Sequence, residues 1–437
     1  MWPIPRFEAV SPRVQIGHIY NSAEYCQYVS GRLESDECVR LTDVVQRLLN
    51  NLENRAVAKR TAKPDFPGFH FRNRLNSLTI FMGRHTRLAG LQHLRFLAAF
   101  AVLAHHIFEE ASGSPLALVP DAAQRVGACG VDIFFVISGL VMWHTTGGFS
   151  AQTSAKRFFA RRFTRIMPTY WVCLAIVVAL SCSGIAFRHM QFDAVGLTES
   201  VLLLPPTTSG GLVMGVAWTL VYELYFYLVC TAALCLPWQR CRVALIVALI
   251  AIVPGALETA GATAQAQYYG NPIVIEFLCG VFLGAASARL PEPGPRIRWV
   301  MLMTSVALFC WASVASPEGA TYGLPPSFRW WAWGLPATLL VAAFMHTEDK
   351  GGRIGRAMTV LGNASYVLYL THGFWMNVFA RAVKSGAFHD SLSLYLAASC
   401  VAGLAVAFAL GVHLYLEKPL LAWIEGKRSR IRQTALT

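Results

Sequence analysis

The sequence predicts an all-α integral membrane protein, a bundle of about ten transmembrane helices with both termini in the cytoplasm. Three observations lead to this fold class. The 437 residues are 55% hydrophobic and only 14% charged, whereas soluble domains carry about 25% charged residues. Apolar runs of membrane-spanning length recur from residue 91 onward. Cationic residues gather in alternate loops between these runs.

Ten apolar segments account for the membrane part. Each is close to the roughly 20 residues that a helix needs to cross the hydrocarbon core. The expected spans are 91–108, 127–144, 166–187, 212–236, 241–258, 272–290, 299–315, 329–346, 359–381 and 392–416.

The loop charges set the orientation, because Lys and Arg concentrate in cytoplasmic loops. The opposite loops hold few cations, although Arg381 and Lys384 stand between the last two spans. This alternation places both termini in the cytoplasm, and it explains the net charge of +13 without a nucleic-acid partner. The basic loops contain Arg84 and Arg87, Lys156 to Arg165, Arg240 and Arg242, Arg289 to Arg298, Lys350 to Arg356, and Lys418 to Arg432.

Composition divides the chain into three parts. Residues 1–85 form a polar N-terminal extension, 86–420 form the transmembrane domain, and 421–437 form a basic cytoplasmic tail. Helical spacing of Leu and Val predicts an amphipathic helix near 35–60. Met82 precedes a short basic stretch and the first span, so it is a natural start for a protein of this kind. We therefore expect no catalytic role for the extension.

The eleven cysteines include no C-x-x-C pair and have no ligand-like spacing with histidine. Most of them lie in apolar runs, where a cysteine behaves as a small hydrophobe. We expect neither a disulfide framework nor a metal site. Residues 1–30 also lack the apolar segment of a cleavable signal peptide.

The first span, LQHLRFLAAFAVLAHHIF, carries ionisable groups that are costly inside a bilayer. Arg95 and His106 are eleven residues apart, almost three helical turns, so they share one face about 16 Å apart along the axis. His105 is turned well away from that face. One face thus presents a cation near one membrane surface and a titratable imidazole deep inside.

The second span contains GVDIFFVISGLVMW, with Asp132 near its outer end. Asp132 either caps the helix, because it follows Gly130, or partners a histidine or a substrate hydroxyl. Ser138 and Gly139 are small enough to let another helix pack closely.

The third span begins in RFFARRFTRIMPTYW. Arg162 and Arg165 are three residues apart and share a helical face. They lie closest to the apolar run, where they suit forked hydrogen bonds to phosphate. Topology alone explains Lys156, Arg157 and Arg161.

Two further spans carry polar side chains at membrane depth. WTLVYELYFYLV places Glu223 in mid-membrane beside Tyr222, and an acid in that position needs a partner or a function. LGNASYVLYLTHGFW carries His372 beside Tyr366 and Tyr369. A lone histidine on an apolar face is more often a packing residue. The alternative for His372, as for Tyr222, is contact with a substrate.

An ordered set of segments between residues 88 and 420 resembles the acyltransferase-3 family of membrane O-acyltransferases, most of all the bacterial exopolysaccharide O-acetyltransferases. The resemblance implies a ten-helix core that takes an acyl group from cytoplasmic acyl-CoA and places it on a sugar hydroxyl. The segments are LAGLQHLRFLAAFAVLAHHI, GVDIFFVISGLVM, RRFTRIMPTYW, WTLVYELYFYL, LGNASYVLYLTH and LEKPL.

The family's motifs fall on residues already singled out. The chain departs from the family at Thr219 and Tyr222, has Leu224 where a second acid is common, and carries the unusual N-terminal extension. The family's arginine-x10-histidine pattern matches Arg95 and His106, its R-x-x-R pattern matches Arg162 and Arg165, and its acidic position matches Glu223.

Together these features predict an acyltransferase of the bacterial inner membrane. It would move an acyl group, acetyl by resemblance, from acyl-CoA to a sugar hydroxyl of an exopolysaccharide or a lipid-linked oligosaccharide. Acyl-CoA is a donor substrate here, and no cofactor is bound permanently. The weakly nucleophilic hydroxyl needs a general base, which typically contributes about 10²–10⁴-fold. The candidate residues are His106, Glu223 and Asp132 for catalysis, Arg95, Arg162 and Arg165 for the donor, and Tyr222 and His372 for the substrate.

A multispanning transporter or flippase of sugar-lipids is the alternative function. Buried Arg, Glu and His also line ion and proton paths in transporters. The sequence lacks the paired short, broken spans that indicate inverted repeats. Turnover of an acyl-CoA thioester by purified protein would support the enzyme, and acyl-independent uptake into vesicles would support the transporter.

Overall fold

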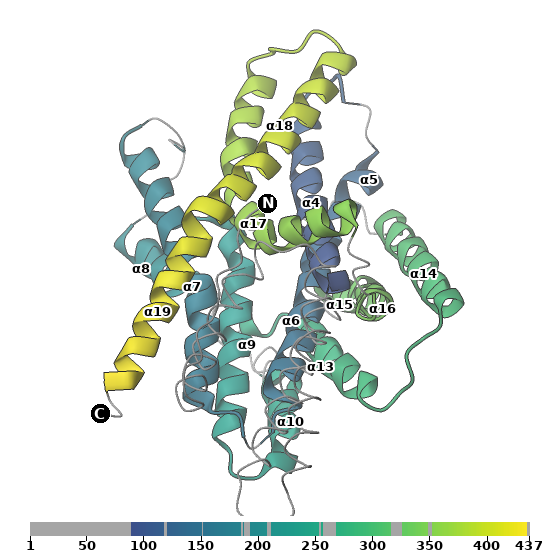
Figure 1. The fold of residues 1–437 in the computed structure, drawn as a ribbon. Helices are drawn as coiled ribbons and strands as arrows, with labels where there is room; N and C mark the ends of the chain where they lie inside the picture. Colours follow the sequence, from purple (N-terminus) through teal and green to yellow (C-terminus); the bar gives the residue numbers. More distant parts are fainter. Residues whose placement is uncertain are drawn as a thin grey trace, which may run out of the picture. The chain divides into compact units, whose positions relative to one another are not determined.

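The computed structural model describes residues 89–117, 120–150, 152–184, 187, 193–207, 211–252, 255–256, 268–315, 326–347 and 352–434. All regular secondary structure within these ranges is helical, which confirms the all-α prediction (Figure 1). The extension 1–85, including the helix expected near 35–60, lies outside the described residues.

Helices occupy every segment in which a span was predicted. Short 3₁₀ or π turns extend several of them, such as the π turn Ala248–Ile252 after α10. The helices are α4 (Ala89–Ala111), α5 (Asp121–Val126), α6 (Gly130–Thr146), α7 (Ala155–Cys182), α8 (Ala194–Leu202), α9 (Trp218–Cys235), α10 (Gln239–Val247), α13 (Ile275–Ser287), α14 (Pro295–Val314), α15 (Pro326–Ala332), α16 (Gly334–Phe344), α17 (Arg353–Lys384), α18 (Ser391–Val412) and α19 (Lys418–Thr434).

Six helical stretches among the described residues are long and apolar enough to cross a membrane by length and composition. Pro272–Ser287 is apolar but shorter, and the predicted eighth span is divided between α15 and α16. A count of ten and cytoplasmic termini therefore stay predictions. The six stretches are Ala89–Ala111, Gln124–Thr146, Ala155–Cys182, Gly215–Cys235, Pro295–Val314 and Ser391–Gly426.

Helix α4 lies at the centre of the bundle. It packs along α17 and also contacts α5, α6, α16 and α18 (Figure 1). The buried face of α4 is built from Leu and Ala side chains such as Leu94, Ala98 and Leu103. The helix that carries Arg95 and His106 is thus held by its neighbours along its whole length.

Glycine allows α6 to approach α13 closely. A Cβ atom on Gly139 would lie 2.0 Å from the carbonyl oxygen of Phe277, and one on Gly280 would lie 2.0 Å from that of Val136. The two helices therefore meet backbone to backbone, as the small residues in the second span predicted for Gly139. On the same side of α6, Phe135 stacks on Phe277 at 4.5 Å between ring centroids.

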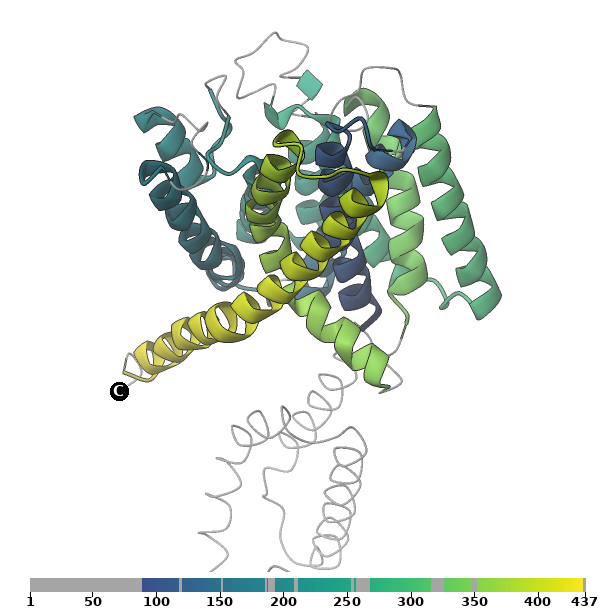
Figure 2. The same cartoon turned by 90° about the horizontal axis from the view of Figure 1, so that it is seen from above.

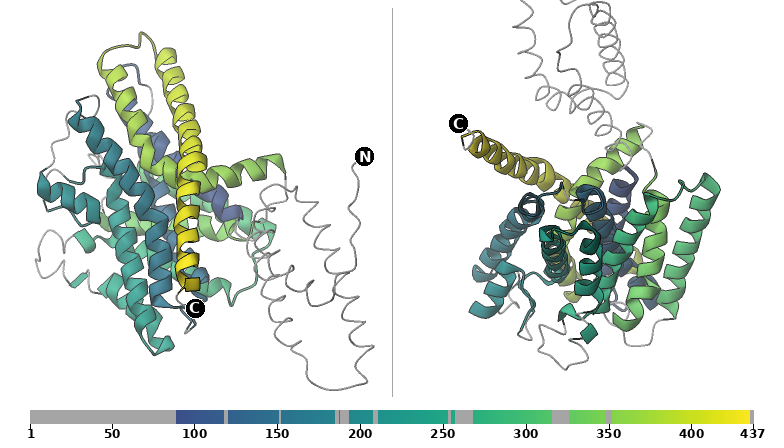
Figure 3. Two further views of the ribbon diagram at one scale, coloured as in Figure 1. Left: turned by 60° about the vertical axis from the view of Figure 1, so that its left-hand side comes forward. Right: turned by 90° about the horizontal axis from the view of Figure 1, so that it is seen from below.

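The outer helices frame this centre. Seen along the bundle, α7 and α14 lie at opposite edges (Figure 2). Helices α18 and α19 join through the π turn His413–Glu417 into one continuous helix, and α19 extends beyond the other helices (Figures 2 and 3). Inside the π turn, Nδ1 of His413 lies 2.5 Å from Oε2 of Glu417. Residues of α19 thereby reach the cytoplasmic end predicted for α7, which α19 contacts.

Candidate active site

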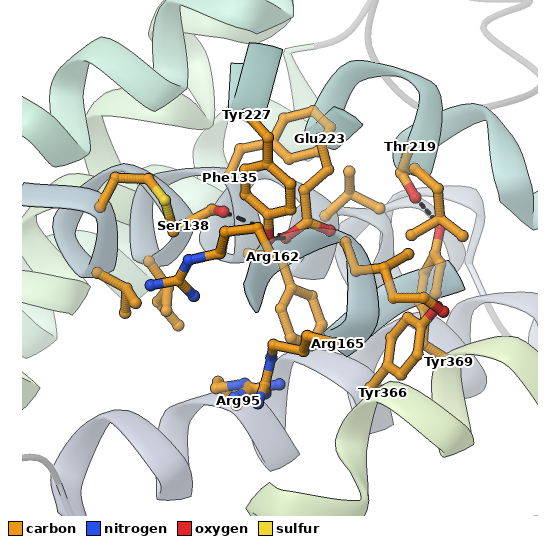
Figure 4. Close-up of a pocket in the computed structure, with 17 residues that line it drawn as sticks. Arg95, Phe135, Ser138, Arg162, Arg165, Thr219, Glu223, Tyr227, Tyr366 and Tyr369 are labelled. Carbon is orange, nitrogen blue, oxygen red and sulfur yellow. Dashed lines mark hydrogen bonds between the residues drawn. The ribbon is translucent and has the colours of Figure 1, made fainter. Parts of the chain in front are cut away.

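A cavity of ≈ 100 Å³ lies among α4, α6, α7, α9 and α17 (Figure 4). All three arginines predicted to bind the donor line it, and so does Glu223. Aromatic and apolar side chains, with the hydroxyls of Ser138 and Thr219, form the rest of the wall. The lining residues are Arg95, Val131, Phe134, Phe135, Ile137, Ser138, Val141, Met142, Arg162, Arg165, Ile166, Thr219, Leu220, Glu223, Tyr227, Tyr366 and Tyr369.

The arginines reach the cavity from two helices. Arg95 comes from the first half of α4, and Arg162 and Arg165 come one turn apart from α7. Nη2 of Arg162 donates to Oγ1 of Thr145 at 2.7 Å. Within the described part of the chain, none of the three forms an ion pair with a carboxylate. The cavity therefore presents three guanidinium groups and one carboxylate, which favours an anionic ligand.

A second cavity, of ≈ 250 Å³, adjoins the first at Arg162 and Arg165, which line both. Arg161 also lines it, although the sequence assigned that residue to topology alone. Helix α19 contributes Leu421 and Glu425 to the wall. The two arginines of the R-x-x-R pattern thus border both cavities.

Glu223 is held by two neutral hydrogen-bond donors. Its Oε1 accepts from the hydroxyl of Tyr227, one turn along α9, at 2.5 Å, and from Oγ of Ser138 at 3.3 Å (Figure 4). Tyr227 is itself buried. Both donors are hydroxyl groups, so Glu223 has no ion-pair partner among the described residues, although three arginines line the same cavity.

Two tyrosines of α17 close one side of the cavity. The Tyr366 hydroxyl donates to the carbonyl of Ile166 at 2.9 Å. The Tyr369 hydroxyl lies 2.8 Å from Oγ1 of Thr219 and donates to the carbonyl of Val216 at 3.0 Å. The ring of Tyr369 is in turn 5.8 Å from that of His372, so Tyr369 separates the cavity from the histidines.

The histidines lie beyond Tyr369 and do not line either cavity. The His106 ring stacks on His372 at 5.2 Å between centroids, and Nδ1 of His106 lies 2.9 Å from Oε2 of Glu109. His372 is buried, with Nδ1 2.7 Å from the carbonyl of Tyr369. His105 instead directs Nδ1 to the carbonyl of Gln124 on α5, at 2.6 Å.

The one-face geometry predicted for the first span is retained, since Arg95 and His106 stand on one uninterrupted helix. Arg95 lines the cavity, and His106 lies farther along the same helix, past the tyrosines. Glu109 is the partner of His106 that the sequence reasoning missed. Its spacing of three residues from His106 was the available signal.

Asp132 lies outside both cavities. Its carboxylate is fully buried and accepts from Nε of Arg329 at 3.0 Å and from Nη2 at 2.7 Å. The capping alternative is wrong, because Cys129 is the N-cap residue of α6 and no side chain caps that end. Arg329 also lies over the ring of Trp333 at 5.0 Å. Both oxygens of Asp132 are therefore engaged in a buried pair between α6 and α15.

Tyr222 also packs away from the cavity. Its ring stacks on Tyr268 at 4.7 Å, and its hydroxyl donates to the Tyr268 carbonyl at 2.8 Å. Of the residues predicted for the substrate, neither Tyr222 nor His372 reaches the cavity wall. Tyr227 and Thr219, on the same helix as Tyr222, take that place.

Fold and site together define a class: a multi-pass helical membrane protein with an arginine-lined cavity beside a histidine pair. Residues 88–412 match the family model described as an acyltransferase domain, and the chain belongs to that family. It is therefore an O-acyltransferase, and this membership favours the enzyme over the transporter. No solved structure matches the chain.

Curated relatives agree with this assignment. The chain is 29% identical over 318 residues to the exopolysaccharide production protein ExoZ of Rhizobium meliloti, covering 70% of this chain and 92% of ExoZ. It is 27% identical over 387 residues to the acyltransferase MdmB of Streptomyces mycarofaciens, covering 79% of this chain and 94% of MdmB. A shorter match, 36% identical over 92 residues, links it to the peptidoglycan O-acetyltransferase OatA of Listeria monocytogenes, covering 20% of this chain and 13% of OatA.

Proposed function

We propose that this protein transfers an acetyl group from cytoplasmic acetyl-CoA to a sugar hydroxyl of an exopolysaccharide or its lipid-linked precursor, in the inner membrane of a bacterium. Similarity to ExoZ, an exopolysaccharide production protein, supports the polysaccharide acceptor. One structural observation supports the donor above all others: Arg95, Arg162 and Arg165 converge on one cavity. CoA carries its phosphates at one end and its thioester at the other, so a cationic cavity suits the phosphate end.

The donor would bind with its phosphates near Arg162 and Arg165, where the two cavities meet. Guanidinium groups make paired, charge-assisted hydrogen bonds to phosphate oxygens. Glu223 would keep these cations oriented, since it lines the same cavity and its own oxygen is fixed by Tyr227. The pantetheine arm would extend toward Tyr369.

His106 would act as the general base. If its Nδ1 donates to Glu109, its Nε2 carries the lone pair that takes a proton. As the sugar O–H gives its proton to Nε2, the oxygen attacks the thioester carbonyl and forms the new ester bond. The C–S bond then breaks, and the leaving thiolate takes up a proton to give free CoA. The Glu109 carboxylate would stabilise the imidazolium that forms in between.

Asp132 has no place in this mechanism, because Arg329 occupies its carboxylate. His372 would hold the His106 ring in position by stacking on it, and would not contact the donor. The thioester must pass the ring of Tyr369 to reach His106. The side chains of Tyr369 and Thr219 would therefore move apart when the donor enters.

The test uses the detergent-purified full chain with acetyl-CoA labelled in its acetyl group. We expect release of free CoA and transfer of label to an exopolysaccharide acceptor. Arg353→Ala, an exposed cation at the start of α17, is the matched control for the cavity arginines and should retain activity. NMR of the polymer made with and without the gene then identifies the acylated hydroxyl. Label that never leaves acetyl-CoA, together with sugar-lipid uptake into vesicles, would reject the proposal.

A further inference from the structure

Three side chains with metal-binding atoms converge at the C-terminal end of α4. His105, His106 and Glu109 each offer one ligand atom, and these three atoms lie within 4.8 Å of one another. The two imidazole rings are 4.9 Å apart between centroids. Imidazole nitrogen and carboxylate oxygen together form the donor set that zinc uses in many proteins.

His105 is already oriented as a metal-binding histidine is. Its Nδ1 lies 2.6 Å from the carbonyl oxygen of Gln124. A carbonyl only accepts, so Nδ1 carries the proton and Nε2 keeps the lone pair that a metal requires. A backbone carbonyl on the second ring nitrogen is the usual way in which proteins fix a metal-bound histidine.

The other two ligands, His106 and Glu109, are accessible, and the three ligand atoms are almost as close together as a bound ion requires. The side chains of His106 and Glu109 are each 33% exposed, so an ion can reach them. A tetrahedral ion with bonds of about 2.0–2.1 Å holds its ligand atoms roughly 3.3–3.5 Å apart. Movement of the Glu109 and His106 side chains by about 1 Å would bring the three ligand atoms to this spacing. Water would then take the fourth coordination position.

We propose that His105, His106 and Glu109 form a site for a divalent transition-metal ion of the zinc class, and that the bound ion inhibits acyl transfer. The ion binds Nδ1 of His106 and Oε2 of Glu109 in place of the proton between them, and that proton moves by way of solvent to Nε2 of the same ring. His106 then has no free lone pair with which to act as a base. The inhibition rests on the proposed function, whereas binding of the ion does not.

Binding is tested first, on the full chain purified in detergent and stripped with a chelator. Zn²⁺ is titrated against a chromophoric zinc indicator, and one tightly bound equivalent is expected. Loss of an outer partner of a metal ligand weakens binding about 10–100-fold, and loss of a ligand costs at least as much. His105→Ala and the isosteric Glu109→Gln should therefore each bind this equivalent at least about tenfold more weakly.

His413→Gln is the matched control. His413 also pairs with a glutamate on its own helix, Glu417, but no third ligand joins that pair among the described residues. This variant should bind Zn²⁺ as the parent does, and Mg²⁺, which prefers oxygen ligands, should not displace the Zn²⁺. An unchanged elution profile on size exclusion confirms that each variant is folded. Equal zinc affinity in parent, His105→Ala and Glu109→Gln, or no tight equivalent in the parent, would overturn the site.

Inhibition is tested on the same preparations with labelled acetyl-CoA and acceptor. Transfer by the parent should fall as the zinc site fills and return when EDTA is added. In His105→Ala, transfer without metal should persist, and inhibition should need at least about tenfold more Zn²⁺. Zinc binding without inhibition would refute the regulatory half. Zinc binding by a protein that shows no transfer even after chelation would refute the proposed function and leave the site standing.

Discussion

The imidazole rings of His106 and His372 stack 5.2 Å apart with only 20° between their planes, and so join α4 to α17. The two environments differ. His372 is 2% exposed and bonded to a backbone carbonyl, whereas the His106 side chain is 33% exposed and bonded to a carboxylate. His106 is therefore the more accessible of the two imidazoles, and His372 packs against it from the buried side.

His106→Ala should abolish transfer while leaving affinity for acetyl-CoA nearly unchanged. Only the proton acceptor is lost, and general-base catalysis is worth about 10²–10⁴-fold. His105→Ala should have a mild effect, because its ring is directed to α5. The measurements are acetyl-CoA affinity and polymer acylation in membranes with matched expression. An active His106→Ala variant beside an inactive His105→Ala variant would assign the general base to His105 instead.

Arg162→Ala and Arg165→Ala should weaken donor binding in preference to the chemical step. Each loses a charge-assisted contact of about 1.5–3 kcal/mol, which corresponds to a rise in the acetyl-CoA KM of about ten- to a hundredfold. Lysine at either position should restore only part of the affinity, because an ammonium group does not fork onto a phosphate. A lower kcat with an unchanged KM would place these arginines at the reacting carbonyl instead.

Asp132→Asn should destabilise the protein even though Asp132 lies outside the cavity. Breaking a buried ion pair by removing one partner typically costs about 3–5 kcal/mol, because the other charge is left uncompensated. Replacing both residues, Asp132→Leu with Arg329→Met, should recover much of this loss. The midpoint of thermal unfolding in detergent measures both. Full stability of Asp132→Asn combined with lost turnover would return Asp132 to the catalytic set.

A chain that starts at Met82 should insert into the membrane and retain most of its transferase activity. The expectation rests on the change in composition near that residue. Membrane fractionation and acetyl transfer, compared with the full chain at equal expression, provide the measurement. Failure of the shortened chain to fold would show that residues 1–81 are needed.

Topology is open to a direct check with reporter fusions. Fusions after Ser112 and Thr208 should report the periplasm, and fusions after Ser154 and Gln239 should report the cytoplasm, because the flanking loops alternate in cations. An inverted pair would overturn the count of ten spans.

Local helical geometry made part of the site predictable. Arg95 and His106 could be related from their spacing alone, and Arg162 and Arg165 likewise, because one helix fixes their relative directions. Glu223 was predictable as a site residue because it is an acid in the middle of an apolar span. For the three arginines and Glu223 the structure adds the shared cavity, which no single helix reveals.

Relations between distant helices were not predictable. Asp132 and Arg329 are 197 residues apart, and periodicity says which face is apolar but not which neighbour it meets. The same limit explains the choice of Tyr222 over Tyr227. Both are tyrosines of one helix, and only the packing of Tyr268 on one and of Glu223 on the other distinguishes them.

The buried pair of Asp132 and Arg329 also imposes an order on biosynthesis. A ribosome adding about 5–20 residues per second needs roughly 10–40 s to travel from one to the other. During that interval α6 has its carboxylate but not its cation, and an unpaired charge opposes full insertion. We expect α6 of nascent chains arrested before Arg329 to be extracted from the membrane by alkali. In longer chains, α6 should resist this extraction.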